Sequence, residues 1–288
     1  MPVAFALKPR DPEGLHELIS RIYDPNSPDF GRYLSPENFR QRFAPSDSDV
    51  QIVIEELQSR GLRIKQVHEN KLLIDAEAPA GVIEAAFQTE IHEYVSPDGR
   101  RVFSPHHDPA VGYTLQSRLN AVVGLDNFQR YRNHSAGSDS HSPMARQPIS
   151  NPDRYMTPQK IKSAYDLSTA PTVGSGEVVA LFQLDGYDKN DIAKYAQHFS
   201  ITAPPLQDVW VDGFNGSIGE NTDEVALDIE LVMAVSPGLS KIMVYSGPNT
   251  DLGVLHTYQR IANDNEAKVV SSSWGAPEDR SSFAFRNA

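Results

Sequence analysis

Apolar residues in the first 130 positions change their period several times, which indicates a domain of mixed short helices and strands. Apolar runs predict strands, whereas apolar residues three or four apart behind Asp-Pro, Ser-Pro or Ser-Asp pairs predict capped helices. The expected elements are a strand over 3–7, helices that begin at 11–13, 35–37 and 46–49, a helix over 80–87, and hairpins over 62–76 and 91–104. This mixture is typical of an α+β domain with a mainly antiparallel sheet.

From about residue 153 the pattern becomes regular, because strands and helices alternate. The run Val178–Phe182 is continuously apolar, as expected for a strand buried on both faces. The expected strands lie over 176–184, 208–211, 241–245 and 268–272, and the expected helices over 190–199, 222–235 and 251–263. Repeated strand–helix units predict an α/β domain with a parallel sheet, whose ligands bind beyond the carboxyl ends of the strands. Because the last strand would leave an open edge, residues 153–288 are expected to form an incomplete domain.

The segment between these parts, residues 131–152, has no apolar period and is rich in Ser, Gly, His and Pro. Such composition predicts an exposed linker. Exposed linkers are preferred sites of proteolytic cleavage, so this segment is the expected processing region.

The helix expected over 222–235 carries acids on two of its faces. The residues on the arc that is expected to face the core are Val225, Ala226, Ile229, Val232 and Met233. Asp223 and Glu230 fall on the opposite side and are expected to be solvated. The stripe that borders the core arc, and is expected to face a cleft, consists of Glu224, Asp228, Leu231 and Val235.

Glu224 and Asp228 lie one helical turn apart on that stripe. Two like charges so close raise the proton affinity of at least one of them, which suits acid–base chemistry below neutral pH. Two alternatives remain open at this point. The acids can be plain surface charges, with Glu224 stabilising the helix N-terminus. They can also be the carboxylate pair of a glycosidase, although only Trp274 offers a clear sugar-stacking aromatic.

Composition narrows the classes of partner. The net charge of −12 and the absence of a basic stripe argue against nucleic acid. No apolar run approaches the ~20 residues that span a bilayer, and the first ten residues do not form a signal peptide. The 288 residues contain no cysteine, which excludes disulfides, thiolate metal sites and a cysteine nucleophile.

The pattern Glu-x-x-x-Asp-x-Glu at Glu224, Asp228 and Glu230 resembles the signature of the sedolisin (serine-carboxyl) peptidases, and most of all their kumamolisin-like members. Further segments resemble the same family in the same order along the chain. They lie at 24–34, 43 and 124–127, which resemble its activation prodomain, and at 155–165, 174–187, 245–250 and 269–279, which resemble its catalytic domain. The resemblance implies an activation prodomain over 1–130, then the linker, then the N-terminal part of a subtilisin-like peptidase domain over 153–288.

The resemblance also implies roles for individual residues. Glu224 would be the general base for a serine nucleophile, and Asp228 would orient it and share its proton. Ser273, Trp274 and Gly275 match the strand that lines the substrate cleft, although Trp274 can equally be a core residue packed on the sheet. Gln183 replaces a Glu that is linked to the acid pair in many members, which predicts an altered pH optimum.

Other parts of the family's machinery, the serine nucleophile, the oxyanion-stabilising Asp and a calcium site, would lie after residue 288. The parent is therefore expected to be a secreted acid endopeptidase that binds calcium and acts on proteins or peptides. The 288 residues alone are expected to be inactive and to hold no cofactor or metal. A non-catalytic binding or folding module is the alternative class.

Seven of the nine histidines precede residue 150. They can be a solvated scatter. A sharper hypothesis is that their protonation below about pH 6 loosens the prodomain, with His106 and His107 as the residues to replace.

Overall fold

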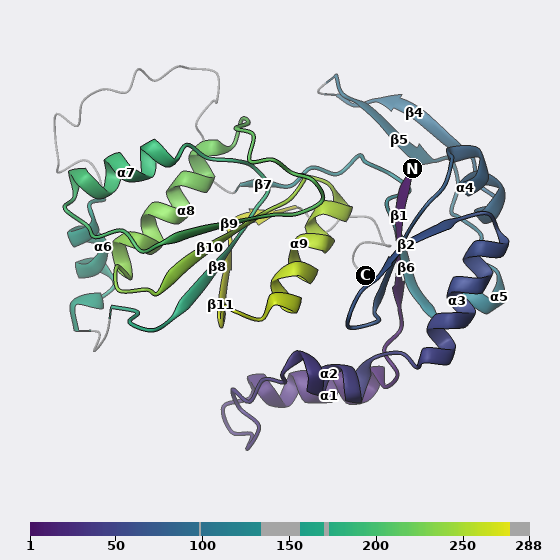
Figure 1. Cartoon of the computed structure of the whole chain (residues 1–288), viewed down its shortest axis with the longest axis horizontal. Helices are drawn as coiled ribbons and strands as arrows, with labels where there is room; N and C mark the ends of the chain where they lie inside the picture. Colours follow the sequence, from purple (N-terminus) through teal and green to yellow (C-terminus); the bar gives the residue numbers. More distant parts are fainter. Residues whose placement is uncertain (98, 134–155, 170–172, 277–288) are drawn as a thin grey trace. The chain divides into compact units, whose positions relative to one another are not determined.

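The computed structural model describes residues 1–97, 99–133, 156–169 and 173–276 (Figure 1). It divides into two compact units, each with its own sheet. The first consists of Met1–Arg130 with Thr250–Leu255, and the second of Tyr131–Asn249 with His256–Ala276. Among the helices in these ranges, none has the length and hydropathy to cross a membrane.

The first unit is built on a four-stranded antiparallel sheet with the order β2-β3-β1-β6. The strands are β1 (Pro2–Leu7), β2 (Arg63–Val67), β3 (Leu73–Glu77) and β6 (Leu119–Val123). Strand β1 is central, and its residues from Val3 onward are buried. Strand β6, which the sequence pattern did not predict, is the neighbour of β1 on the side away from β3. The antiparallel sheet predicted for this part of the chain is confirmed.

The helices of the first unit are α1 (Pro12–Tyr23), α2 (Pro36–Phe43), α3 (Asp47–Ser59), α4 (Ala80–Phe87) and the short α5 (Tyr113–Gln116). The first three begin where capping residues predicted them, α4 was predicted without a cap, and α5 was not predicted. Asp11, Ser35 and Ser46 each accept a hydrogen bond from a backbone N–H of the first turn. Alternate residues of β1 point toward α3 and α4, so that Phe5 joins Leu57 and Phe87 in one core.

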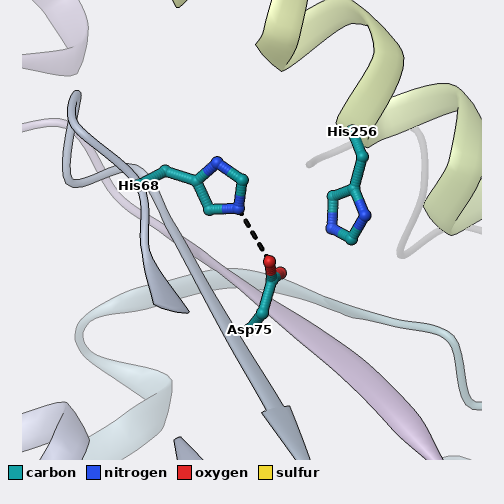
Figure 2. Close-up of side chains that lie close together, drawn as sticks. All are labelled: His68, Asp75 and His256. Carbon is teal, nitrogen blue, oxygen red and sulfur yellow. Dashed lines mark hydrogen bonds and ion pairs between the residues drawn. The ribbon is translucent and has the colours of Figure 1, made fainter. Parts of the chain in front are cut away.

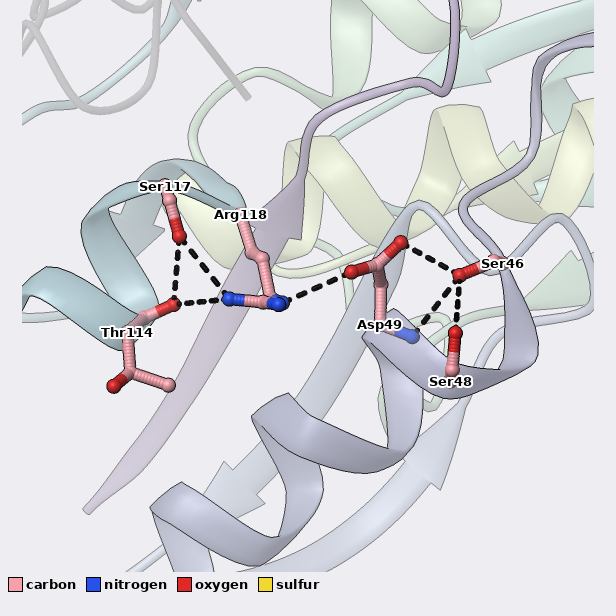
Figure 3. A network of polar contacts seen from close by, with 6 residues as sticks. All are labelled: Ser46, Ser48, Asp49, Thr114, Ser117 and Arg118. Carbon is pink, nitrogen blue, oxygen red and sulfur yellow. Dashed lines mark hydrogen bonds and ion pairs between the residues drawn. The ribbon is translucent and has the colours of Figure 1, made fainter.

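A polar network holds the start of α3 against the end of α5 (Figure 3). The hydroxyl of Ser46 accepts from the N–H of Asp49 at 3.1 Å and donates to its carboxylate at 2.6 Å. The guanidinium of Arg118 donates to the other Asp49 oxygen at 3.0 Å and to the carbonyl of Thr114 at 3.1 Å. The hydrogen bond from Ser46, with a smaller effect of Arg118, lowers the pKa of Asp49.

The first unit also contains a separate hairpin, formed by β4 (Ile91–Val95) and β5 (Arg101–Pro105). Its base carries three histidines. The rings of His92 and His106 stack with centroids 4.7 Å apart, and His107 meets His106 edge-on at 6.1 Å. Directly after β2, His68 is buried and hydrogen-bonds through Nε2 to Asp75 of β3 at 2.8 Å (Figure 2). His68 therefore does not fit the simpler interpretation, in which the histidines are scattered over the surface and exposed to solvent.

The second unit contains a four-stranded parallel sheet with the order β11-β8-β10-β9. The strands are β8 (Val178–Gln183), β9 (Leu206–Trp210), β10 (Lys241–Ser246) and β11 (Val269–Ser272). The centres of β8 and β10 are fully buried, which the continuous apolar run Val178–Phe182 predicted for β8. Strand β11 lies at an edge and exposes Val269 and Val270. The predicted parallel sheet is confirmed.

The helices of the second unit are α6 (Pro158–Ala164), α7 (Lys189–His198) and α8 (Thr222–Val235), with a 3₁₀ turn at Leu167–Thr169. Helix α9 (Asp251–Asp264) is divided, because its residues up to Leu255 belong to the first unit and those from His256 to the second. Helix α8 packs against α6, α7 and β8. Two short strands, β7 (Arg132–Asn133) and β12 (Trp274–Gly275), pair antiparallel, so regular structure continues past the predicted start of the linker at 131. Residues 134–152 of that linker lie outside the described ranges, as do 277–279 of the segments that resemble the peptidase family.

Candidate functional site

The candidate site is formed on α8, on the side that faces the ends of β8 and β11. Glu224 and Asp228 are only 8% and 9% exposed, so they are not the surface charges of the simpler alternative. Val225, Ile229 and Met233 on the adjoining arc are completely buried and hold the helix against the sheet. The helix therefore keeps two carboxylates one turn apart, with Cβ atoms about 5–6 Å apart, at the border of the core.

Asp228 is held from the strand side by Gln183, the last residue of β8. The Gln183 amide donates from Nε2 to Asp228 Oδ2 at 2.7 Å, while its Oε1 accepts from the indole Nε1 of Trp274 at 2.8 Å. Because an indole N–H can only donate, the amide oxygen must face Trp274 and the amide NH₂ must face Asp228. The orientation of the fully buried Gln183 is thus fixed by chemistry, and it places a donor on the carboxylate.

Ser273, which follows β11, holds the second oxygen of Asp228. Its hydroxyl donates to Oδ1 at 2.7 Å. Both oxygens of Asp228 therefore accept hydrogen bonds from side chains outside α8, which fixes the plane of the carboxylate. The sequence did not predict this contact, since Ser273 and Asp228 lie 45 residues apart and no spacing rule joins them.

The position of this cluster agrees with the topology of the sheet. Strands β8 and β11 are parallel neighbours, and Gln183 and Ser273 lie at or just beyond their carboxyl ends. In open parallel sheets this edge is where ligands bind. The cluster thus occupies the place that the alternation of strands and helices predicted for a site.

Trp274 and Gly275, which were predicted to line a substrate cleft together with Ser273, form β12. Gly275 pairs with Arg132 of β7. Trp274 is 8% exposed and packs within the second unit, yet its indole also belongs to the hydrogen-bonded chain that leads to Asp228. Trp274 therefore packs in the core, which is one of the two roles that the sequence left open, and it also supports Asp228 through Gln183, a contact that the sequence did not predict. Contact of these residues with substrate stays a prediction.

The environment of Glu230 differs from the prediction that it is solvated. It is partly buried beside α7, because α7 packs against the side of α8 that carries Glu230. Burial, and secondarily the charge of Asp191 on α7, raise the pKa of Glu230 to about 7. Leu231, by contrast, is exposed rather than enclosed with the acids. Asp223 is exposed, as predicted.

The described residues of each unit, taken separately, bring no three His, Asp or Glu side chains together as ligands for a metal ion. What the cluster on α8 offers is acid–base chemistry. Asp228 is fixed by two donors, and Glu224 lies one turn away on the same buried stripe. A carboxylate pair of this kind can move protons at a pH where a histidine base is already protonated.

Comparison with known proteins finds similarity along most of the chain, so that both units are covered. Residues 1–128 match the family model described as the Pro-kumamolisin activation domain. The chain is 29% identical over 265 residues to kumamolisin from Bacillus sp. (strain MN-32), an alignment that covers 86% of this chain and 46% of the relative. It is 26% identical over 295 residues to xanthomonalisin from Xanthomonas sp. (strain T-22), with 96% and 35% covered.

Among solved structures, a Pseudomonas sedolisin (serine-carboxyl proteinase) complexed with two molecules of pseudo-iodotyrostatin aligns with a TM-score of 0.36 and 18% identity. That alignment covers 40% of this chain and 33% of the other. The chain spans less than half the length of the curated relatives described above.

Proposed function

The chain is a relative of the sedolisin peptidases, and its first 128 residues match their activation domain, so we propose that it belongs to the proenzyme of an acid-acting serine-type endopeptidase. The observation that carries this proposal is the buried acid pair. Glu224 and Asp228 match the Glu-x-x-x-Asp pattern of the family, and Asp228 is held by Gln183 and Ser273 at the carboxyl edge of a parallel sheet.

In the proposed reaction, Glu224 is the general base. It accepts the proton of a serine hydroxyl of the whole protein as the serine oxygen bonds to the peptide carbonyl carbon. The proton then passes to the departing amine as the C–N bond breaks, which leaves an acyl-enzyme. Water repeats the sequence and releases the acid product. Asp228 orients Glu224 and shares its proton, and its own position is fixed by two donors.

The first unit is proposed to be the activation prodomain of this enzyme. It would assist folding of the peptidase domain, block access of protein substrates and be removed by cleavage within 131–152. The mature enzyme would act on proteins or peptides outside the cell.

The test replaces each acid by its amide in the whole protein and measures digestion of casein near pH 4. We expect Glu224→Gln to lower kcat by about 10²–10⁴-fold, because general base catalysis is lost while size and hydrogen bonding are nearly kept. Asp228→Asn should also lower kcat, because an amide cannot share a proton with Glu224. The matched control is Asp223→Asn, an exposed acid on the same turn.

Casein digestion that survives both amide substitutions unchanged would refute the proposal. A parallel assay on a polysaccharide separates the peptidase from a glycosidase that uses the same two carboxylates.

A further inference from the structure

Asp185 lies two residues beyond Gln183 and is 7% exposed. Its carboxylate accepts hydrogen bonds from three backbone N–H groups. We propose that Asp185 is a positioning residue for the acid pair, because it fixes the first turn of α8, and with it Glu224, against the carboxyl end of β8. What the pair does chemically rests on the function proposed above. The attachment itself is a property of the second unit alone.

The three hydrogen bonds join two loops. Oδ1 accepts from the N–H of Gly186 at 2.7 Å and from the N–H of Gly219 at 2.7 Å, and Oδ2 accepts from the N–H of Asn221 at 2.8 Å. Gly219 and Asn221 belong to the loop that leads into α8. A buried carboxylate that receives several N–H donors is a strong and directional anchor, because each bond is charge-assisted.

The two loops approach so closely that only glycine fits at two positions. A Cβ atom at Gly219 would lie 2.7 and 2.8 Å from the two carboxylate oxygens of Asp185. A Cβ atom at Gly186 would collide with the carbonyl oxygens of Gly216 and Ser217. The backbone on both sides of the Asp185 carboxylate is thus shaped around it, which distinguishes this contact from a chance surface interaction.

The anchor leads to Glu224 through the backbone. Asn221 is the N-cap residue of α8, and its side chain makes no capping hydrogen bond. Its N–H is held by Asp185, and its carbonyl accepts the N–H of Glu224 at 3.0 Å. Asp185 therefore takes over part of the task of a cap, and a negative charge at this end of the helix is favourable to the helix dipole.

Helix α8 is consequently attached to the end of β8 at two points. Asp185 holds Asn221, the residue before its first turn, and Gln183 holds Asp228 about two turns later. Two attachments about two turns apart prevent rotation of the helix about its axis, which a single attachment would allow. The pair of attachments fixes the direction in which both carboxylates point.

The first experiment tests the attachment in this chain. Asp185→Asn keeps the size, but the amide NH₂ would face at least one of the three N–H donors. We expect hydrogen exchange at residues 219–224 to become roughly 10-fold faster, which corresponds to one lost buried hydrogen bond, while α7 keeps its rate. The matched control is Asp188→Asn three residues later, because Asp188 caps α7 through the N–H of Asn190 and Asn is an equally good cap. Unchanged exchange at 219–224 would overturn the inference.

The second experiment measures kcat and KM of the whole protein at a temperature well below the Tm of each variant. For Asp185→Asn we expect kcat to fall about 10–100-fold with little change in KM, because a misplaced base slows chemistry rather than binding. A lower Tm with normal kcat per folded molecule would mean a merely structural role and would overturn the proposal. If Glu224→Gln leaves kcat unchanged, the proposed function fails instead, while the exchange result still decides whether Asp185 holds α8.

Discussion

Gln183 shows at the scale of one residue how a neutral side chain sets the charge state of a buried site. It bridges the Trp274 indole and Asp228 without adding a second negative charge. A carboxylate in its place would face Asp228 at hydrogen-bond distance, and the two groups could then share a single proton. The residue type at position 183 therefore determines whether this position makes the stability of the second unit depend on pH.

We predict that Gln183→Glu destabilises this chain more at pH 7 than at pH 4. The introduced carboxyl would have a folded pKa above its unfolded value, so the folded state binds the extra proton. The stability is then retained below the pKa of the unfolded state and is lost as the pH rises through the pKa of the folded state. Urea unfolding at the two pH values measures this, and we expect a loss of about 1–3 kcal/mol at pH 7. Gln183→Met, which introduces no charge, is the control, and its loss of stability should differ less between the two pH values.

The residue scale is also where sequence reasoning reaches its limit. The spacing of Glu224 and Asp228 predicted a shared helix face, and their burial agrees with that. Two contacts of α8 could not be found in the same way, that of Ser273 with Asp228 and that of Asp185 with the residue before the first turn, because Ser273 and Asp185 reach the helix through the order of strands in the sheet. In retrospect, the signal for Asp185 is an Asp-Gly pair directly after a buried strand.

At the scale of elements, capping residues were the most reliable predictors. Asp11, Ser35 and Ser46 start helices where expected, because a cap acts through its own neighbours in sequence. Glu230 shows the opposite case. Its angle on the helix was predicted, but the packing of α7 on that side was not, since periodicity gives a direction and no neighbour. Strand β6 was missed for the same reason, because its place beside β1 depends on tertiary pairing.

Glu230 provides a prediction for the packing of α7 against α8. Its pKa is raised from 4.5 to about 7, so the folded state binds a proton that the unfolded state releases. This contribution to stability is fully present below about pH 4.5 and is lost as the pH rises through 7. The second unit should therefore hold its α7–α8 packing better in acid than at neutral pH.

Glu230→Gln should remove this pH dependence. We expect the variant to be roughly 1–2 kcal/mol more stable than the wild type at pH 8 and nearly equal at pH 4, after discounting for partial solvent screening. Urea unfolding across this range measures it, with the exposed Asp223→Asn as control. Parallel stability curves for wild type and Glu230→Gln would contradict the prediction.

In the first unit, the Ser46–Asp49–Arg118 network predicts the opposite pH dependence of stability, with a loss in acid. Hydrogen bonding from Ser46 lowers the pKa of Asp49. The contribution of Asp49 to stability is therefore present above 3.8, the pKa in the unfolded state, and is lost as the pH falls further. Ser46→Ala should cost about 1 kcal/mol at pH 7, as is typical for loss of an N-cap, and less at pH 2.5. Thermal unfolding at both pH values measures this. Ser59→Ala, at the other end of α3, is the control.

At the scale of the whole molecule, the change in apolar pattern after residue 130 predicted two units with different sheets, and the structure contains an antiparallel and a parallel one. The division into two units was predictable because the pattern of apolar and polar residues reflects which positions are buried, and it does so over many residues at once. The two units also differ in what the comparisons match, since the activation-domain match ends at residue 128 and the acid pair lies at 224 and 228.

The last prediction concerns how acid would act on the proposed prodomain. His92 and His106 stack at 4.7 Å, His107 contacts His106, and Glu90 pairs with His92 at 3.1 Å. Histidine side chains gain charge between pH 7 and 5. Two stacked cations then repel each other, with a single carboxylate among these contacts to offset them. Acid should therefore weaken the β4–β5 hairpin before it weakens the main sheet.

Replacing His106 and His107 by Asn in the whole protein should lower the pH at which the prodomain is released by roughly half a unit or more, because the repulsion is removed. Release is measured as the appearance of the processed form over a pH series. His16→Asn, an exposed histidine on α1, is the control. If the double variant and the wild type are processed at the same pH, the hairpin histidines do not drive activation, and the buried His68–Asp75 pair becomes the group to replace next.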